Sequence, residues 1–363
     1  MDNHVTIMDV ARAAGVSKGV VSAVLSGRGG TIRVSAARRA AVEQAARRLD
    51  YKPNLMARSL LSRKSYLLAY LCPGGGGTWG VSTRLLRGLQ RSALRRGYSL
   101  VVYPSDSLES ERENIRAALA RQVDGMLVSP LMLDMESNIS EYHRLLSEGL
   151  PLVQIGMICA GLPTVMRDYR ACAREGVHRL LERGFRRVAF VVHSNYVDPL
   201  TGPASHAMFL GYQEGMAEAG LPCEIVPVNV DSVRCASTQA YKAMALEVAH
   251  DAFAQHLNAH AAPDAVLATN HNLAYGVGLA LRERGVAAPE DVPIISCSDD
   301  YVLPSLVFPQ LSGFPIDGEA LSEAAIALCL GETSAAQPIL VPQPYVERES
   351  FRSLPCPAKG VSK

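Results

Sequence analysis

Ser17 and Lys18 place a hydroxyl and a primary amine where the sequence pattern predicts the start of a helix. The first turn of a helix exposes unpaired backbone N–H groups, and these groups, a serine hydroxyl and a lysine ammonium all bind phosphate oxygens. Lys18 can also contact the edge of a guanine base. Thr6 stands before an earlier helical pattern in the same way. The expected chemistry is binding of a phosphate-rich partner.

Two short helical patterns carry these residues, and a glycine joins them. The first pattern ends at Gly15, and apolar residues at helical spacing resume after Ser17. Two helices held at a fixed angle by a short glycine-containing turn form a helix-turn-helix, whose second helix can enter the major groove of DNA. Residues 36–49 are rich in alanine with apolar spacing, and they predict a third helix that completes a small helical head.

Charge is divided unequally along the chain. The net charge is +1 over 363 residues, yet residues 1–64 hold twelve Lys and Arg against four Asp and Glu. The head therefore has an excess of eight positive charges, and the rest of the chain an excess of seven negative charges. A basic segment joined to an acidic body is typical of a polyanion-binding domain attached to a second module.

The head resembles the LacI-type family of bacterial repressors at many positions, in order and at nearly the family spacing. The matching residues are Thr6, Ile7, Asp9, Val10, Ala11, Ala14, Gly15, Val16, Ser17, Val21, Ser22, Val24, Leu25, Gly27, Val34, Ser35, Arg39, Val42, Leu49, Tyr51, Pro53, Asn54, Ala57, Arg58, Ser59 and Leu60. A helix-turn-helix pattern alone would be weakly specific, whereas this number of matches is a strong signal. The resemblance implies a DNA-binding transcriptional regulator, most often a repressor.

The resemblance implies two sets of DNA contacts. The head is expected to contribute Thr6, Ser17, Lys18, Gly19, Val20, Ser22, Ala23 and Arg28, and the following segment Asn54, Ala57, Arg58 and Leu60. Gly19 has no side chain, and Val20 and Ala23 offer only apolar contact, as to a thymine methyl group. The set of polar base contacts is therefore small.

Residues 51–60 predict a helix that is too short to be stable alone in water. By resemblance, Leu60 matches the leucine that family members insert into the minor groove at the operator centre, where such wedges unstack a base step and bend the duplex. Hinge helices of this kind work in pairs, which predicts a homodimer on a near-palindromic double-stranded operator. The alternative is that Leu60 and Leu61 pack on the following domain.

After residue 65, strand patterns alternate with helix patterns. Strands are expected at 67–71, 99–103, 125–129, 151–155, 187–192, 225–230, 265–268 and 293–297, and helices at 83–96, 110–121, 141–148, 172–183, 204–219, 237–260, 273–284 and 318–329. This alternation predicts parallel sheets with helices on both faces. The resemblance continues to about residue 352, and it implies an α/β sensor domain of two lobes and a cleft, similar to periplasmic sugar-binding proteins.

The expected organisation is an all-α head followed by this sensor domain. The expected regions are a helix-turn-helix domain at 1–50, a hinge helix and linker at 51–65, an effector-binding and dimerisation domain at 66–352, and a loose tail at 353–363. The first lobe is expected at 66–160 and 316–336, and the second at 164–314 and 338–352. The chain would then cross between the lobes near 157–167, 313–317 and 335–340.

Polar groups at the carboxyl ends of strands line the clefts of α/β sheets. By resemblance, Asn270 and Asp299 fall where the family hydrogen-bonds ligand hydroxyls, which suits a sugar. Met208 stands where the family has a ligand-clamping arginine, and His271 where an acid usually follows the asparagine. Trp79, the single tryptophan, can stack on a ring or cover its own loop. These departures leave three alternatives to an ordinary sugar: a larger effector, a more apolar one, or none.

Other functional classes find little support in the sequence. It contains no HExxH motif and no nucleotide-binding loop, and no two of its eight cysteines have CxxC spacing, so we expect no enzymatic activity, no cofactor and no metal. We also find no signal peptide and no apolar run of roughly 18 residues, which predicts a soluble cytoplasmic protein without membrane contact. The alternative to a ligand-modulated repressor is a ligand-binding sensor with a degenerate head, which Gly19 and Ala23 would explain.

Overall fold

The computed structural model forms two compact units, Met1–Tyr66 and Leu67–Lys363. It describes residues 5–25, 34–51, 59, 62, 64–74, 83–133, 136–156, 159–199, 202–229, 238–299 and 309–351. Six expected site residues lie outside this part of the chain: Arg28, Asn54, Ala57, Arg58, Leu60 and Trp79. Every helix in the described part is too short or too polar to cross a lipid bilayer.

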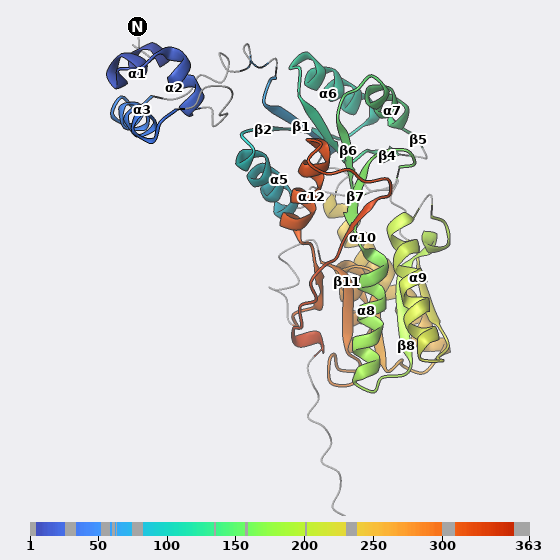
Figure 1. Cartoon of the computed structure of the whole chain (residues 1–363). Coiled ribbons are helices and arrows are strands. Elements are labelled where there is room, and N and C mark those ends of the chain that lie inside the picture. The colour runs from blue at the N-terminus through green and yellow to red at the C-terminus, as the bar shows by residue number, and fades with distance from the viewer. Residues whose placement is uncertain are drawn as a thin grey trace, which may run out of the picture. The chain divides into compact units, whose positions relative to one another are not determined.

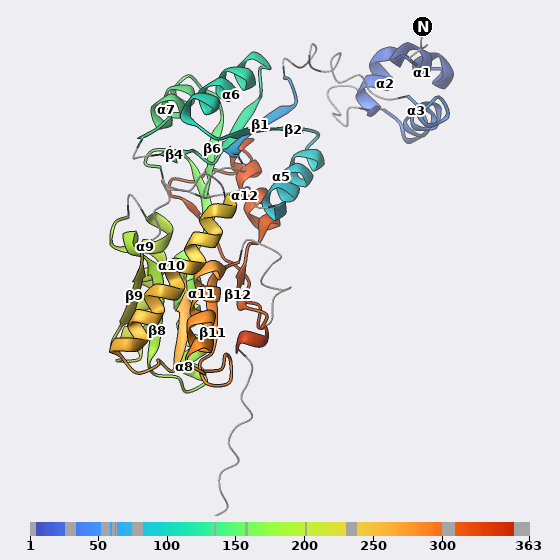
Figure 2. The same ribbon diagram turned by 180° about the vertical axis from the view of Figure 1, so that it is seen from behind.

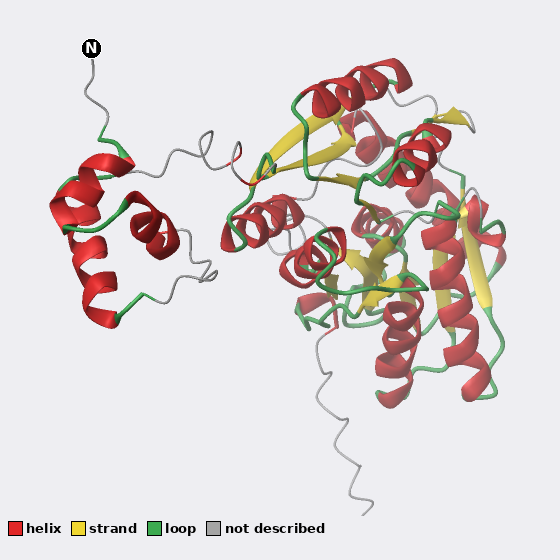
Figure 3. Cartoon of the chain, turned by 45° about the horizontal axis from the view of Figure 1, so that its top comes forward, coloured by secondary structure: helices red, strands yellow, loops and turns green. Residues whose placement is uncertain are grey.

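The first unit contains the three expected helices, α1 (Ile7–Ala14), α2 (Lys18–Leu25) and α3 (Ala36–Arg48), as Figure 3 shows. Thr6 begins α1 with a capping box, in which the backbone N–H of Asp9 donates to the Thr6 hydroxyl and the Asp9 carboxylate accepts from the Thr6 N–H at 2.9 Å. Gly15 ends α1 with a φ of 63°, a left-handed conformation that favours glycine. The buried core is Val10, Ala11, Val21, Val24, Val42 and Ala45.

The second unit begins with a six-stranded parallel sheet (Figure 1). Its strands, in spatial order, are β13 (Ile339–Val341), β7 (Thr164–Arg167), β6 (Leu152–Ile155), β3 (Gly125–Val128), β1 (Leu67–Pro73) and β2 (Ser99–Ser105). Its helices are α5 (Thr83–Arg95), α6 (Leu108–Ala120), α7 (Ile139–Ser147) and α12 (Gly318–Cys329). Helices α5 and α12 approach closely, since a Cβ at Gly88 would lie 2.4 Å from the carbonyl oxygen of Gly318. A short hairpin, β4 (Met132–Leu133) and β5 (Glu136–Ser137), follows β3.

A five-stranded parallel sheet forms the second lobe. Its spatial order is β12 (Ser312–Pro315), β11 (Ile294–Asp299), β10 (Ala265–Ala268), β8 (Val188–His193) and β9 (Glu224–Val228). One face packs on α8 (Tyr169–Glu182) and α9 (Pro203–Glu218), and the other on α10 (Thr238–Ala259) and α11 (His271–Glu283), which Figure 2 shows in front. Short 3-10 turns follow at η1 (Ser194–Val197) and η4 (Glu349–Phe351).

The helices and longer strands follow the sequence expectations, but the limits of the lobes do not. Strand β7 pairs with β6 and β13, so residues 164–167 and 339–341 belong to the first sheet, although we expected them in the second lobe. These strands have only four and three residues, which is too short for a periodic pattern to assign them to a sheet. The chain therefore crosses between the lobes after Arg167, Pro315 and Val341.

Candidate nucleic-acid interface and ligand cleft

The N-terminal end of α2 is built as the sequence predicts. The backbone N–H of Val20 donates to the Ser17 hydroxyl at 3.4 Å, and the N–H of Val21 donates to the Ser17 carbonyl at 3.2 Å. Ser17, Lys18 and Gly19 are exposed. Because the Ser17 oxygen acts here as an acceptor, its hydroxyl proton remains a donor suited to a phosphate.

The other expected contacts on α2 are less accessible. Val20 is half-buried and packs against the core of the head, so it serves packing as well as any contact with a base. Ser22 and Ala23 are also half-buried. The exposed chemistry of α2 is therefore concentrated in its first turn.

Exposed basic side chains occur on all three helices of the head. They are Arg12 on α1, Lys18 on α2, and Arg38, Arg39, Arg47 and Arg48 on α3. Arg12 lies 3.3 Å from Asp9, and the hydrogen bonds from Thr6 hold the pKa of Asp9 below its usual value. Arg38 and Arg39 stand in the first turn of α3, where positive charge opposes the helix dipole. Because their charge does not stabilise α3, we consider Arg38 and Arg39 as candidates for phosphate contacts. Sequence analysis did not identify them.

Asn270 lies at the carboxyl end of β10 and forms the N-cap of α11. Its side-chain oxygen accepts the backbone N–H groups of Asn272 at 3.0 Å and Leu273 at 3.1 Å. Its amide nitrogen lies 3.1 Å from Nε2 of His193, which ends the neighbouring strand β8. Burial lowers the pKa of His193 to about 4, so its ring is neutral at pH 7 and Nε2 accepts the amide proton.

This pair changes the role expected for Asn270. Its oxygen is already used by two backbone donors of α11, so the side chain can offer a ligand only the remaining N–H. His193 was not singled out from the sequence, although a histidine directly after an expected strand was a usable signal. Asp299 ends β11, the strand beside β10, and so reaches the same edge of the sheet.

The two remaining described candidates are buried. Met208, on α9, is 4% exposed and belongs to the apolar cluster that contains Phe190 and Tyr212. It packs in the core of the lobe because this side of α9 faces the sheet, so we no longer expect it to contact a ligand. His271 is 3% exposed in the first turn of α11.

Comparison with known proteins accounts for both units. A model of the lacI family of bacterial regulatory proteins matches residues 6–54, and a model of periplasmic binding protein-like domains matches residues 177–351. Catabolite control protein A of Priestia megaterium is 29% identical over 315 residues, which cover 85% of this chain and 86% of that protein. The first unit thus matches the lacI family of bacterial regulatory proteins, and the chain is similar to a curated regulator over most of its length.

Solved structures share the fold of this protein along nearly its whole length. The lac repressor dimer bound to operator and the anti-inducer ONPF has a TM-score of 0.63 at 22% identity and covers 95% of this chain and 98% of its own. A complex of the regulator CelR with cellobiose has a TM-score of 0.59 at 24% identity and covers 96% and 100%. The lacI-family match of the head and the similarity to curated regulators make the chain a DNA-binding transcriptional regulator.

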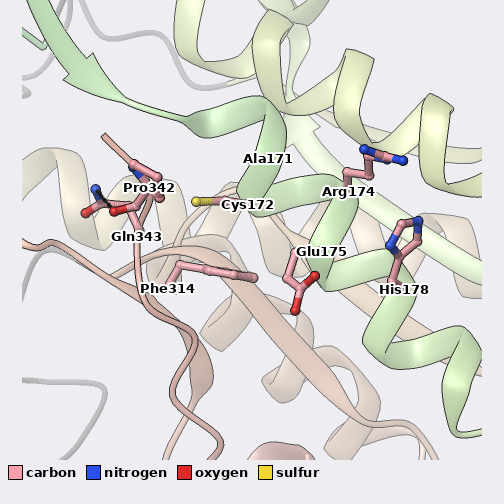
Figure 4. Close-up of a pocket in the computed structure, with 8 residues that line it drawn as sticks. All are labelled: Ala171, Cys172, Arg174, Glu175, His178, Phe314, Pro342 and Gln343. Carbon is pink, nitrogen blue, oxygen red and sulfur yellow. Dashed lines mark hydrogen bonds between the residues drawn. The ribbon is translucent and has the colours of Figure 1, made fainter. Parts of the chain in front are cut away.

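A pocket of about 290 Å³ lies elsewhere in the second unit, beside α8 (Figure 4). It is lined by Ala171, Cys172, Arg174, Glu175, His178, Phe314, Pro342 and Gln343, and by none of the expected effector residues. Arg174 and His178 bind Glu218 of α9 at 2.7 and 2.8 Å, and Glu175 forms an ion pair with Arg179 at 2.6 Å. Among the described residues, no group of three or more potential metal ligands occurs here or elsewhere.

Proposed function

We propose that this protein represses transcription by binding a near-palindromic duplex operator as a homodimer. The observation that carries the proposal is the exposed first turn of α2, where the cap at Ser17 leaves a hydroxyl donor beside the Lys18 ammonium. Exposed arginines on α1 and α3 add positive charge to the same small head. Phosphate contacts of this kind give affinity and register, and the α2 side chains add a limited reading of base edges.

We further propose that a carbohydrate or related small molecule binds between the lobes and changes the affinity for DNA. Support comes from the carboxyl ends of β8 and β10, where neutral His193 meets Asn270. A neutral, hydrogen-bonding pair suits a hydroxyl-bearing ligand better than a strongly charged one. The relatives with known complexes include a cellobiose-bound regulator. By linkage, a ligand that prefers one lobe arrangement must also change the affinity for DNA. The size of this change is set by the ratio of the ligand's affinities for the two arrangements.

Because a regulator of this kind would act on bacterial chromosomal DNA, we propose a cytoplasmic location and a role that requires no catalytic activity. Its contacts with DNA would be made by Thr6, Ser17, Lys18, Gly19, Val20, Ser22 and Ala23, together with Arg28, Asn54, Ala57, Arg58 and Leu60 outside the described residues.

The deciding experiment is selection of bound duplexes from a random-sequence library by the full-length protein at low salt. We expect enrichment of a near-palindromic sequence whose affinity falls steeply with salt concentration. A matched control is Arg116→Ala, which removes an exposed arginine from α6 in the second unit and should leave DNA affinity unchanged. If no sequence is enriched at low salt, the alternative of a sensor with a degenerate head replaces the repressor.

A further inference from the structure

Arg167 connects the two lobes through its side chain. It is the last residue of β7, in the sheet of the first lobe, and it is 3% exposed. Its Nη1 donates to the Ser298 hydroxyl on β11 at 2.9 Å, and its Nη2 donates to the Phe314 carbonyl on β12 at 2.9 Å. A buried cation that is attached to one sheet is therefore hydrogen-bonded to two strands of the other sheet.

Two further hydrogen bonds complete this junction. The three crossing segments are the stretches of chain that follow Arg167, Pro315 and Val341. The backbone N–H of Asp168 donates to the carbonyl of Val341 at 3.0 Å, which joins the first crossing segment to the third. The N–H of Asp317 donates to the side-chain oxygen of Gln343 at 2.7 Å, which joins the second crossing segment to the third. Arg167 joins the first to the second through Phe314. Each of the three crossing segments is thus bonded to the other two.

The Arg167 contacts depend on the relative position of the lobes in a way that backbone contacts inside one lobe do not. A buried guanidinium is costly unless its donors are satisfied, and its fork is rigid and planar. Hydrogen bonds weaken steeply beyond about 3.2 Å, so a displacement of β12 relative to β7 by much less than one side-chain length breaks them. Burial of Arg167 therefore favours a single orientation of the lobes over others.

We propose that Arg167 is a positioning residue that fixes the resting orientation of the two lobes. Its effect on DNA affinity rests on the proposed function, because the lobe orientation is the equilibrium that effector and operator would bias. Its effect on the junction is independent of that function and can be measured on the protein alone.

The test is hydrogen–deuterium exchange on the full-length Arg167→Met variant. We expect at least tenfold faster exchange at residues 164–169 and 312–317, on both sides of the junction. Strands β3 and β10, inside the separate lobes, should keep their exchange rates. Unchanged exchange at the junction overturns the proposal, and so does an equal increase throughout both lobes, because that would be general destabilisation.

Arg183→Met is the matched control. The Arg183 guanidinium also makes several contacts, but inside the second lobe: with the Phe351 carbonyl at 2.8 Å, the Glu347 carboxylate at 2.7 Å and the Phe351 ring at 4.0 Å. Its loss should leave exchange at residues 164–169 unchanged. If Arg183→Met loosens β7 as much as Arg167→Met does, the junction role of Arg167 is refuted.

Two milder variants keep the test decisive if Arg167→Met fails to fold. Ser298→Ala removes one acceptor in the second lobe, and exchange at residues 164–169 should rise several-fold. Arg167→Lys keeps the charge but not the two-point fork, so it should give intermediate exchange. Full protection in Arg167→Lys would show that charge alone suffices, which contradicts positioning by geometry.

DNA binding supplies a second readout with the duplex selected by the unsubstituted protein. Arg167→Met should change its affinity at least threefold, whereas Arg183→Met should not. Equal affinities for all three proteins overturn the link between the junction and DNA. If the unsubstituted protein selects no duplex, it is the proposed function that fails, and the exchange experiment still decides the role of Arg167.

Discussion

The side-chain amide of Asn270 lies 3.1 Å from Nε2 of His193, so two strands of the second sheet end in one hydrogen-bonded pair. The amide caps helix α11, and the imidazole is held neutral by burial. One pair therefore connects the stability of α11 with the binding of ligand that we propose here, and both properties can be tested separately.

The neutral ring of His193 predicts a loss of stability in weak acid. Its pKa falls from 6.5 to about 4 on folding, so the unfolded chain binds a proton at a higher pH than the folded chain. The stabilisation is complete above pH 6.5 and decreases as pH falls toward 4, by about 2 kcal/mol between pH 6.5 and pH 5. Urea unfolding of the wild type and His193→Gln at both values measures this, and an identical pH dependence of the two proteins would contradict the assignment.

Replacement of Asn270 should separate its two roles. Asn270→Ala removes the cap acceptor of α11 and should lower the free energy of unfolding by about 1 kcal/mol. Asn270→Ser restores a cap acceptor but not the amide donor, so it should recover stability without recovering affinity for the sugar that the wild type binds. Thermal unfolding and calorimetric titration with a panel of sugars distinguish these effects. Equal ligand affinity in Asn270→Ser and the wild type would contradict the proposed contact between Asn270 and the ligand.

The capping box at Thr6 should support the head as a folded unit. Thr6→Ala removes the hydroxyl that accepts from the N–H of Asp9, and it should destabilise α1 by about 1 kcal/mol. Thr6→Ser keeps the hydroxyl and serves as the control. Hydrogen exchange of residues 7–14 in the full-length protein reports the loss locally, and equal protection in both variants would show that the cap is dispensable.

Lys18 should contribute to DNA affinity through its positive charge and should have little effect on the stability of the fold. Its side chain is exposed at the start of α2, so Lys18→Ala should leave thermal stability unchanged. Affinity for the selected duplex should fall, and the slope of log K against log salt should decrease by about 1 per subunit. Binding measured by fluorescence anisotropy at several salt concentrations tests this, with Arg116→Ala as the control. A lower affinity with an unchanged slope would indicate a base contact instead of a phosphate contact.

The sequence by itself determined the features that depend on neighbouring residues. The three helices of the head, the cap at Ser17 and the alternation of strands with helices follow from periodicity, capping residues and glycines over a few turns of chain. Resemblance to the LacI-type family extended this to the expected two-lobed domain, which the comparisons support.

Tertiary structure alone decided which distant residues meet. His193 and Asn270 are 77 positions apart, and Arg167 and Ser298 are 131 positions apart, so no local pattern links either pair. The sheet that receives β7 and β13, and the burial of Met208, likewise depend on packing between segments far apart in the chain. Local propensity selects an element, whereas its neighbours are selected by the burial and hydrogen bonding of the whole domain.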